Sequence, residues 1–174
     1  MYCLIAAETA IFSIFVVAYL FYIGKSLTGP QPKDVLHAPI FYTVCLLSSS
    51  LTVHSAVRRM AAGKTAAFGR WWMLTILLGG TFLFGTAREW RHLIVDESLT
   101  IDTNLFGTTY YSLVGLHAFH VTMGLLALIT VALFYFANRL RQEHAERLEV
   151  LSLYWHFVDA VWVVVFVVVY VIGV

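Results

Sequence analysis

Charged residues are scarce in this chain of 174 residues: only 12% are Asp, Glu, Lys or Arg, against about a quarter in soluble domains. Hydrophobic residues make up 60%, and the mean hydropathy is +0.82. Water cannot solvate most of such a surface, which excludes an ordinary soluble domain. The net charge of +1 lacks the basic excess that nucleic-acid binding needs, so we expect no nucleic-acid partner.

Cysteine is also rare, and both residues of this type, Cys3 and Cys45, fall within apolar runs. We expect them near opposite membrane faces, where no disulfide can join them. No repeat or low-complexity linker is evident, and Gly or Pro breaks within the apolar runs are too few for a typical transporter. The first run begins at Met1 without a basic n-region or a small-residue cleavage site, so we interpret it as a mature span.

What the chain does contain is a series of long apolar segments. A helix needs about 20 mostly apolar residues to cross the hydrocarbon core of a bilayer. We therefore predict an all-α polytopic membrane protein, with residues 1–174 forming a single transmembrane domain and one bundle of five helices. The predicted spans are Met1–Ile23, Pro39–Val57, Trp71–Ala87, Phe106–Phe136 and Leu151–Val174.

The distribution of Lys and Arg in the connecting segments predicts the orientation. The connections Arg58–Arg70 and Asn138–Val150 carry most of the arginines, which places them in the cytoplasm. Arg88–Asn104 contains three acidic residues, Asp96, Glu97 and Asp102, beyond its two arginines and is expected outside. Gly24–Ala38 is then also outside by alternation, although it contains two lysines. The N-terminus is expected in the cytoplasm and the C-terminus outside.

Ionisable residues inside spans cost about 2.5–3.5 kcal/mol each on insertion scales and are functional candidates. The chain has five such residues: Glu8, His117, His120, His156 and Asp159. At about 1.5 Å of rise per residue, all except His117 fall in one layer of the inner leaflet. His117 is expected near the middle of the bilayer. We predict that these groups converge at a common depth and face protein or a filled cleft.

The spacing of these residues leaves several roles open. His156 and Asp159 are i, i+3 neighbours that can pair, either as a proton relay or as an ion pair that holds two helices in register. His117 and His120 share a face with small residues, which favours hydrogen bonding between helices or contact with a lipid headgroup. One His-x-x-His pair lacks the further ligands of a closed metal site, so we predict no metal site.

Aromatic residues near the ends of the spans are typical of the membrane interface. We assign to this interface belt Trp71, Trp72, Trp90, Tyr110, Tyr111, Tyr154 and Trp155.

Several motifs together resemble one known family. The sequence YWHFVDAVW (residues 154–162) resembles the last-helix signature of subunit III of the haem–copper terminal oxidases, the cytochrome c oxidase type. FGTTYYSLVGLHAFHVTMG (106–124) resembles the penultimate helix, and LLSSSLTVHSA (46–56) resembles a Ser/Thr-rich helix of the family. AAETAIFSIF (6–15) resembles the helix with the buried glutamate of the family, which falls on Glu8.

The match is looser elsewhere. In LGGTFLFGTAREW (78–90), Gly79, Phe82 and Glu89 fit, whereas Thr86 and Trp90 stand where the family usually has glutamine and tyrosine. In the segment just before the last helix, Glu149 is the residue that matches the family pattern. Longer members of the family have two additional N-terminal helices that have no counterpart here.

The resemblance implies a subunit without a catalytic centre, in which haem and copper belong to the partner subunits I and II. This chain would pack against subunit I, hold phospholipid and support proton uptake in a bacterial cell membrane, and it would meet cytochrome c only through the complex. The implied residues for proton-uptake support and lipid binding are Glu8, Glu89, His117, His120, Glu149, His156 and Asp159. The expected helix-packing residues are Gly79, Gly115, Gly124, Trp155 and Trp162.

Two other interpretations remain at this point. The chain could be the equivalent subunit of a quinol oxidase or a nitric oxide reductase complex, because the electron donor binds elsewhere. It could also be a stand-alone haem or metal protein, or a proton channel built on the same polar residues.

Overall fold

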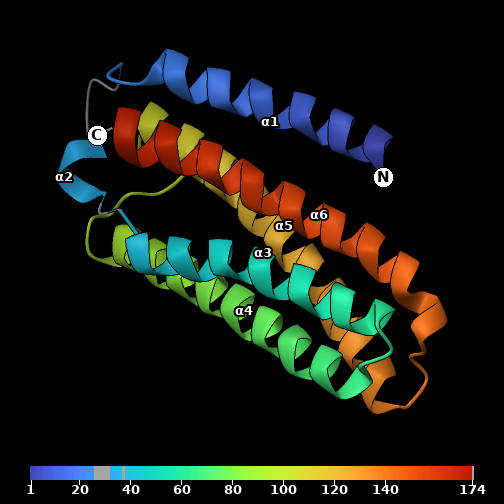
Figure 1. The fold of residues 1–174 in the computed structure, drawn as a ribbon. Helices are drawn as coiled ribbons and strands as arrows, with labels where there is room; N and C mark the ends of the chain where they lie inside the picture. Colours follow the sequence, from blue (N-terminus) through green and yellow to red (C-terminus); the bar gives the residue numbers. More distant parts are fainter. Residues whose placement is uncertain (26–31, 37, 174) are drawn as a thin grey trace. The chain divides into compact units, whose positions relative to one another are not determined.

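The computed structural model describes residues 1–25, 32–36 and 38–173, and these residues are largely helical. Within these ranges no β-strand occurs, and five helical segments are long and apolar enough to span a membrane. The predicted all-α membrane fold with five spans is therefore confirmed. The helices are α1 (Tyr2–Tyr22), α2 (Pro32–Val35), α3 (Ile40–Ala61), α4 (Thr65–Val95), α5 (Leu105–Phe136), η1 (Gln142–His144), α6 (Ala145–Phe166) and η2 (Val167–Ile172) (Figure 1).

The helices follow from the apolar surroundings that this composition demands. In hydrocarbon each backbone N–H and C=O must find its partner within the same segment, which the α-helix achieves. Hydroxyl side chains also bond back to their own helix: Thr9 Oγ1 donates to the Ile5 carbonyl and Ser13 Oγ to the Thr9 carbonyl, each at 2.7 Å. Short polar residues can therefore occupy α1 without leaving a donor unsatisfied.

Contacts within the chain group it into two compact units. The first unit consists of Met1, Ile40–Phe84 and His120–Asp159, which include α3, the first part of α4, the last part of α5 and most of α6. The second unit consists of Tyr2–Pro39, Gly85–Phe119 and Ala160–Val174. Our assignment of a single domain over residues 1–174 stays a prediction.

In the first unit, α3 and the first part of α4 run antiparallel and are joined by a short turn (Figure 1). Gly63 ends α3 in a left-handed conformation with a φ of +71°, which favours glycine. The Lys64 N–H then donates to the Arg59 carbonyl at 2.9 Å, which completes a helix-ending motif. The turn brings the hydroxyl oxygens of Thr52 and Thr75 to 2.8 Å from each other.

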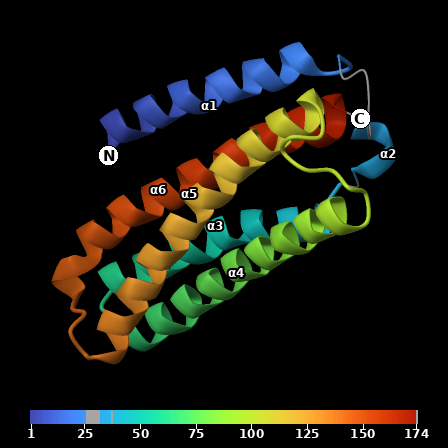
Figure 2. The ribbon, with the colours of Figure 1, turned by 180° about the vertical axis from the view of Figure 1, so that it is seen from behind.

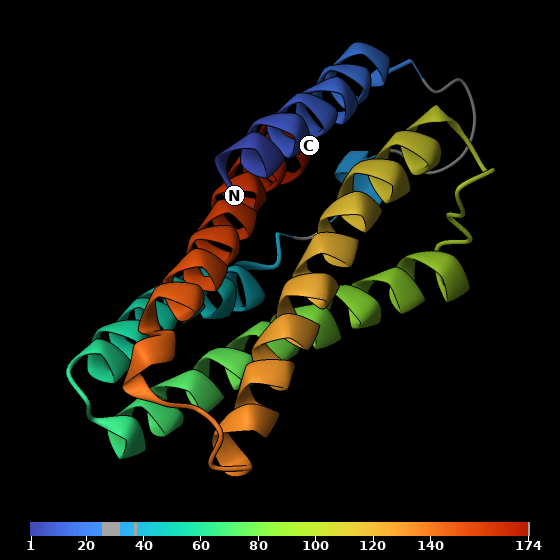
Figure 3. The same ribbon diagram turned by 90° about the vertical axis from the view of Figure 1, so that its right-hand side faces the viewer.

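In the second unit, α1 lies beside the C-terminal end of α6 and η2 (Figures 1 and 3). Phe12 and Tyr19 of α1 are buried, with exposed fractions of 4% and 1%. The connection from the end of α4 to the start of α5 folds back on α5 (Figure 2), and the Tyr111 hydroxyl donates to the Leu99 carbonyl at 2.9 Å.

The helices are longer than the predicted spans at several ends. Helix α4 covers Thr65–Val95 where we expected a span over Trp71–Ala87. Its 31 residues extend about 46 Å, beyond the roughly 30 Å of hydrocarbon that hydropathy detects. The helical turn α2 lies in the connection Gly24–Ala38, and the remainder of that connection at residues 26–31 and 37 lies outside the described residues. Val174, the expected end of the last span, also lies outside them.

Candidate functional site

In the first unit, Ser50 of α3 connects His156 and Asp159 of α6. The Ser50 Oγ lies 2.9 Å from His156 Nδ1, and the same hydroxyl donates a hydrogen bond to Asp159 Oδ2. Because a hydroxyl has a single proton and gives it here to the carboxylate, its bond with His156 requires a proton on Nδ1. The order of donation is therefore His156 to Ser50 to Asp159. The described residues contain no direct ion pair between His156 and Asp159, so these two side chains pair only through Ser50.

Burial of these polar groups away from water is unfavourable in free energy. Asp159 is 3% exposed, and within the described part of the chain its Oδ1 has no hydrogen-bond partner. His156 is half-buried, and its ring lies 6.4 Å from the ring of His54, centroid to centroid. A buried carboxyl group inside a membrane helix is tolerated only where its neighbours stabilise it, which is typical of a functional position.

Trp155 packs in the first unit against two glycines from other helices. The Trp155 side chain is fully buried, and its Nε1 donates a hydrogen bond to Ser49 Oγ at 2.7 Å. A Cβ atom added at Gly79 or at Gly124 would lie 2.9 Å from the indole ring. Both glycines are buried, so their lack of a side chain opens the space that the indole fills.

His120 contacts α6 through its backbone. The Tyr154 hydroxyl donates to the His120 carbonyl at 3.2 Å, and the His120 side chain is 8% exposed. This bond connects α5 to α6 in the first unit. Tyr154 lies two residues before His156, which is a partner of Ser50.

In the second unit, His117 stacks on Trp162. The ring centroids are 5.0 Å apart with an interplanar angle of 28°, and both side chains are buried. Phe12 of α1 meets the His117 ring edge-on at 6.4 Å. Glu8 is half-buried one helical turn before Phe12 and thus lies on the same side of α1. The side of α1 that carries Glu8 therefore faces His117.

Glu89 anchors a second polar cluster in this unit. Its Oε1 accepts a hydrogen bond from the Tyr170 hydroxyl at 2.7 Å and one from the Tyr110 hydroxyl at 3.2 Å. The two phenolic oxygens lie 3.4 Å apart. Tyr170 belongs to η2, a π-helical turn at the end of α6, and such turns are frequent at functional sites.

Sequence reasoning missed Ser50 and Tyr170, and it assigned to the interface belt three aromatic residues that are buried, of which Trp155 was also expected to pack between helices. Trp72, Tyr110 and Trp155 were expected in the membrane-interface belt but are at most 1% exposed. The Trp72 Nε1 donates to the Leu128 carbonyl at 2.9 Å, which explains its position inside the first unit.

The remaining predicted residues lie apart from these clusters. Gly115 of the second unit lies in ordinary contact with Trp90, because a Cβ added there would be 3.5 Å from the indole. Glu149 is exposed near the start of α6. The common layer expected for Glu8, His120, His156 and Asp159 includes residues of both units and stays a prediction.

Metal ligands are not clustered in the residues that the structure describes. Across those ranges no three His, Cys, Asp or Glu side chains lie close enough together to hold a metal ion. The chemistry that the described polar groups support is hydrogen bonding and proton exchange between helices.

Comparison with known proteins identifies a family that matches nearly the whole chain. The family model described as cytochrome c oxidase subunit III matches residues 5–174. Proteins named cytochrome c oxidase subunit 3 from Alkalihalophilus pseudofirmus and Bacillus subtilis are 36% and 33% identical to this chain, covering 98% and 97% of it and 84% and 83% of their own lengths. The protein of the same name from Corynebacterium diphtheriae is 39% identical over 84% of this chain and 71% of its own length. The chain therefore belongs to the cytochrome c oxidase subunit III family.

Proposed function

We propose that this chain is the non-catalytic subunit III of a proton-pumping aerobic terminal oxidase of the cytochrome c oxidase type. The observation that carries the proposal is the family match over residues 5–174, together with five helices able to span a membrane. Membership implies a multi-pass membrane protein in a complex with other oxidase subunits. The proposed partners are subunit I by direct packing, subunit II within the complex, and phospholipid. The proposed location is a bacterial cell membrane with the N-terminus in the cytoplasm.

The exposed apolar surface supports a role in assembly. In the 18-residue apolar window of α1 only 11% of residues are buried within the chain, against 44% in the corresponding window of the segment Gln142–Ile172. Large side chains such as Ile14, Val17 and Phe21 are at least 60% exposed. In a membrane these surfaces contact lipid tails or another subunit, which suits a chain that stabilises a larger partner.

The polar groups inside the helices support a role in proton uptake. Hydrogen bonds connect His156, Ser50 and Asp159 into a chain of exchangeable protons, and the side of α1 that carries Glu8 and Phe12 faces His117. We assign to these groups, with His120, the support of proton delivery to subunit I from the cytoplasmic side. Glu89 and Glu149 near the helix ends are proposed to support the same role.

The alternatives are less well supported. A quinol oxidase or nitric oxide reductase subunit would share this fold, but the relatives named above all carry the name cytochrome c oxidase. A stand-alone haem protein or proton channel would not account for the family match along nearly the whole chain.

Purification in a mild detergent tests the proposal. The chain with an affinity tag should copurify with larger subunits that carry haem and copper, in a constant ratio. The chain separated from them should show no Soret absorption. A Soret band that stays with the isolated chain, or purification without any haem-bearing partner, would contradict the proposal.

A further inference from the structure

Aromatic side chains that can be oxidised form a continuous series in the second unit. Between ring centroids, Trp162 lies 6.5 Å from Tyr170, Tyr110 lies 5.2 Å from Tyr111, and Tyr111 lies 5.5 Å from Trp90. The phenolic oxygens of Tyr170 and Tyr110 are 3.4 Å apart and join the two parts of the series. Rings whose centroids are about 4.5–7 Å apart are in contact, and an electron passes readily between such rings.

Glu89 gives this series a proton acceptor. Its Oε1 accepts hydrogen bonds from Tyr170 at 2.7 Å and from Tyr110 at 3.2 Å. Oxidation of a phenol releases its hydroxyl proton, so it is easiest where a base accepts that proton directly. Tyr170 is 7% exposed and Tyr110 is fully buried, so bulk water does not take this role.

Other tyrosines have a different kind of partner. The Tyr111 hydroxyl donates to the Leu99 carbonyl at 2.9 Å, and the Tyr154 hydroxyl donates to the His120 carbonyl at 3.2 Å. A backbone carbonyl accepts a hydrogen bond but is too weak a base to take up the proton. The carboxyl group of Glu89 therefore distinguishes Tyr170 and Tyr110 from these two tyrosines.

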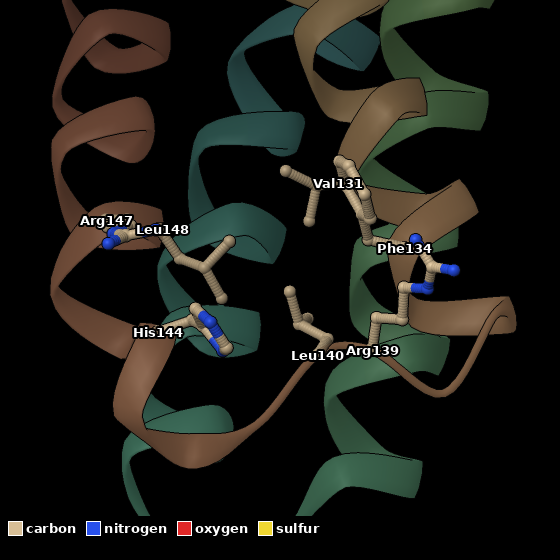
Figure 4. A pocket seen from close by; sticks show the side chains of 7 residues that line it. All are labelled: Val131, Phe134, Arg139, Leu140, His144, Arg147 and Leu148. Atoms are coloured by element: carbon tan, nitrogen blue, oxygen red, sulfur yellow. The ribbon is translucent and has the colours of Figure 1, made fainter.

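The series ends at a cavity that a small molecule can enter. Trp90 and Tyr111 are half-buried and line a space of about 390 Å³ together with Ile94, Thr100 and Ile101. By contrast, the cavity in Figure 4, at the end of α5 and the start of α6, has no tyrosine or tryptophan among the described residues that line it. A soluble reductant in the first of these cavities would contact oxidisable rings directly.

We propose that Tyr170, Tyr110 and Glu89 form a redox-active tyrosine site that takes up oxidising equivalents from peroxide-derived radicals. Such a radical removes one electron from Tyr170, and the O–H bond breaks as the proton moves to Glu89 Oε1. The products are a neutral tyrosyl radical, a protonated Glu89 and the oxidant reduced by one electron.

An ene-diol reductant in the cavity beside Trp90 restores the site. It supplies one electron through the rings of Trp90, Tyr111 and Tyr110, and Glu89 returns the proton to the Tyr170 oxygen. The ene-diol becomes its one-electron-oxidised radical and releases its own proton to water. This activity goes beyond the proposed function and rests on it only for the source of the oxidant, because oxygen reduction in partner subunits can release peroxide.

Electron paramagnetic resonance of the full-length chain in detergent, oxidised by photogenerated ruthenium(III) tris-bipyridine, tests the site. The wild type should give a persistent tyrosyl radical, and Tyr110→Phe combined with Tyr170→Phe should lose it. The matched control Tyr154→Phe should keep it, because that hydroxyl donates to a backbone carbonyl. Equal radical yields in the wild type and the double variant, or loss of the radical in the control, would overturn the proposal.

Infrared spectroscopy of the same sample tests the role of Glu89. Radical formation should convert the carboxylate band of Glu89 into the band of a protonated carboxyl group, and Glu89→Gln should lose the persistent radical while both tyrosines remain. An unchanged carboxylate band in the wild type, which does not depend on how the variant folds, would contradict the proton transfer. A persistent radical of wild-type yield in Glu89→Gln would contradict it as well.

Hydrogen peroxide added to the purified complex, followed by mass spectrometry of its peptides, tests the source of the oxidant. Trp162 should carry more oxidation in the double tyrosine variant than in the wild type, because the radical no longer passes on to Tyr170. Equal oxidation of Trp162 in both would overturn a role against peroxide-derived radicals. The photochemical test needs no haem-bearing partner, so its failure is distinguishable from a failure of the proposed function, which copurification tests.

Discussion

Two adjacent glycines of α4 provide a matched test of how the first unit packs. A Cβ at residue 79 would lie 2.9 Å from Trp155 Cη2 and Cζ2 and 3.3 Å from Leu125 Cδ1, whereas a Cβ at residue 80 would have no atom within 4 Å. We predict that Gly79→Ala destabilises the chain relative to Gly80→Ala. The clash is not relieved by moving the indole, because Trp155 is fully buried, bonded to Ser49 and in contact with Gly124 on another helix.

Two opposing effects determine how much each substitution changes the free energy of unfolding. Replacing glycine by alanine in a helix gains about 1 kcal/mol from propensity, and both variants gain it equally. Inserting a methyl group into a filled space costs about 1–3 kcal/mol. The difference between the variants isolates this cost, so the free energies of unfolding should differ by about 1–3 kcal/mol, or roughly 5- to 150-fold in the unfolding equilibrium.

Unfolding of the purified full-length chain by SDS in mixed micelles, followed by tryptophan fluorescence, measures this difference. Gly80→Ala should unfold at the wild-type SDS fraction or above it, and Gly79→Ala should unfold at a lower one. If the two variants unfold together, the packing of Trp155 against Gly79 is wrong.

Three further changes test the polar groups. Ser50→Ala removes the hydroxyl that donates to Asp159 and should cost about 1–3 kcal/mol of stability in the same SDS assay; an unchanged transition would contradict the cluster. Tyr170→Phe should shift the infrared band of the Glu89 carboxyl more than Tyr110→Phe, because Tyr170 donates at 2.7 Å and Tyr110 at 3.2 Å; equal shifts would argue against this geometry. Glu8→Gln should leave assembly intact but hasten the loss of oxidase turnover, and the exposed control Glu146→Gln should not; wild-type endurance of Glu8→Gln would remove Glu8 from the proton-uptake role.

Hydropathy predicted the five spans because a bilayer demands a long apolar stretch for each crossing. Hydropathy did not predict the ends of α4. Polar residues such as Arg70 and Arg88 keep the helical backbone hydrogen bonds outside the hydrocarbon, but they lower the hydropathy by which a span is detected. The turn α2 was missed for a related reason, because four residues between apolar runs carry no periodic signal.

The polar clusters were predicted only in part. The spacing of His156 and Asp159 places both on one face of α6, but the identity of their partner depends on which residue of α3 lies opposite. Ser50 is one of three consecutive serines in that helix, and nothing in the sequence distinguishes it from the other two. The role of Tyr170 could not be predicted from the sequence for a similar reason, because its hydrogen bond to Glu89 joins two helices that are far apart in the chain.

The central claim is that the chain supports an oxidase without holding its cofactors. The most direct measurement compares the turnover of the purified complex over time before and after this chain is removed by detergent, with haem and copper determined in both samples. We predict equal cofactor content and a similar initial rate, followed by earlier inactivation of the depleted complex and recovery of its endurance when the chain is added back. Loss of haem or copper together with the chain, or equal endurance with and without it, would contradict the account.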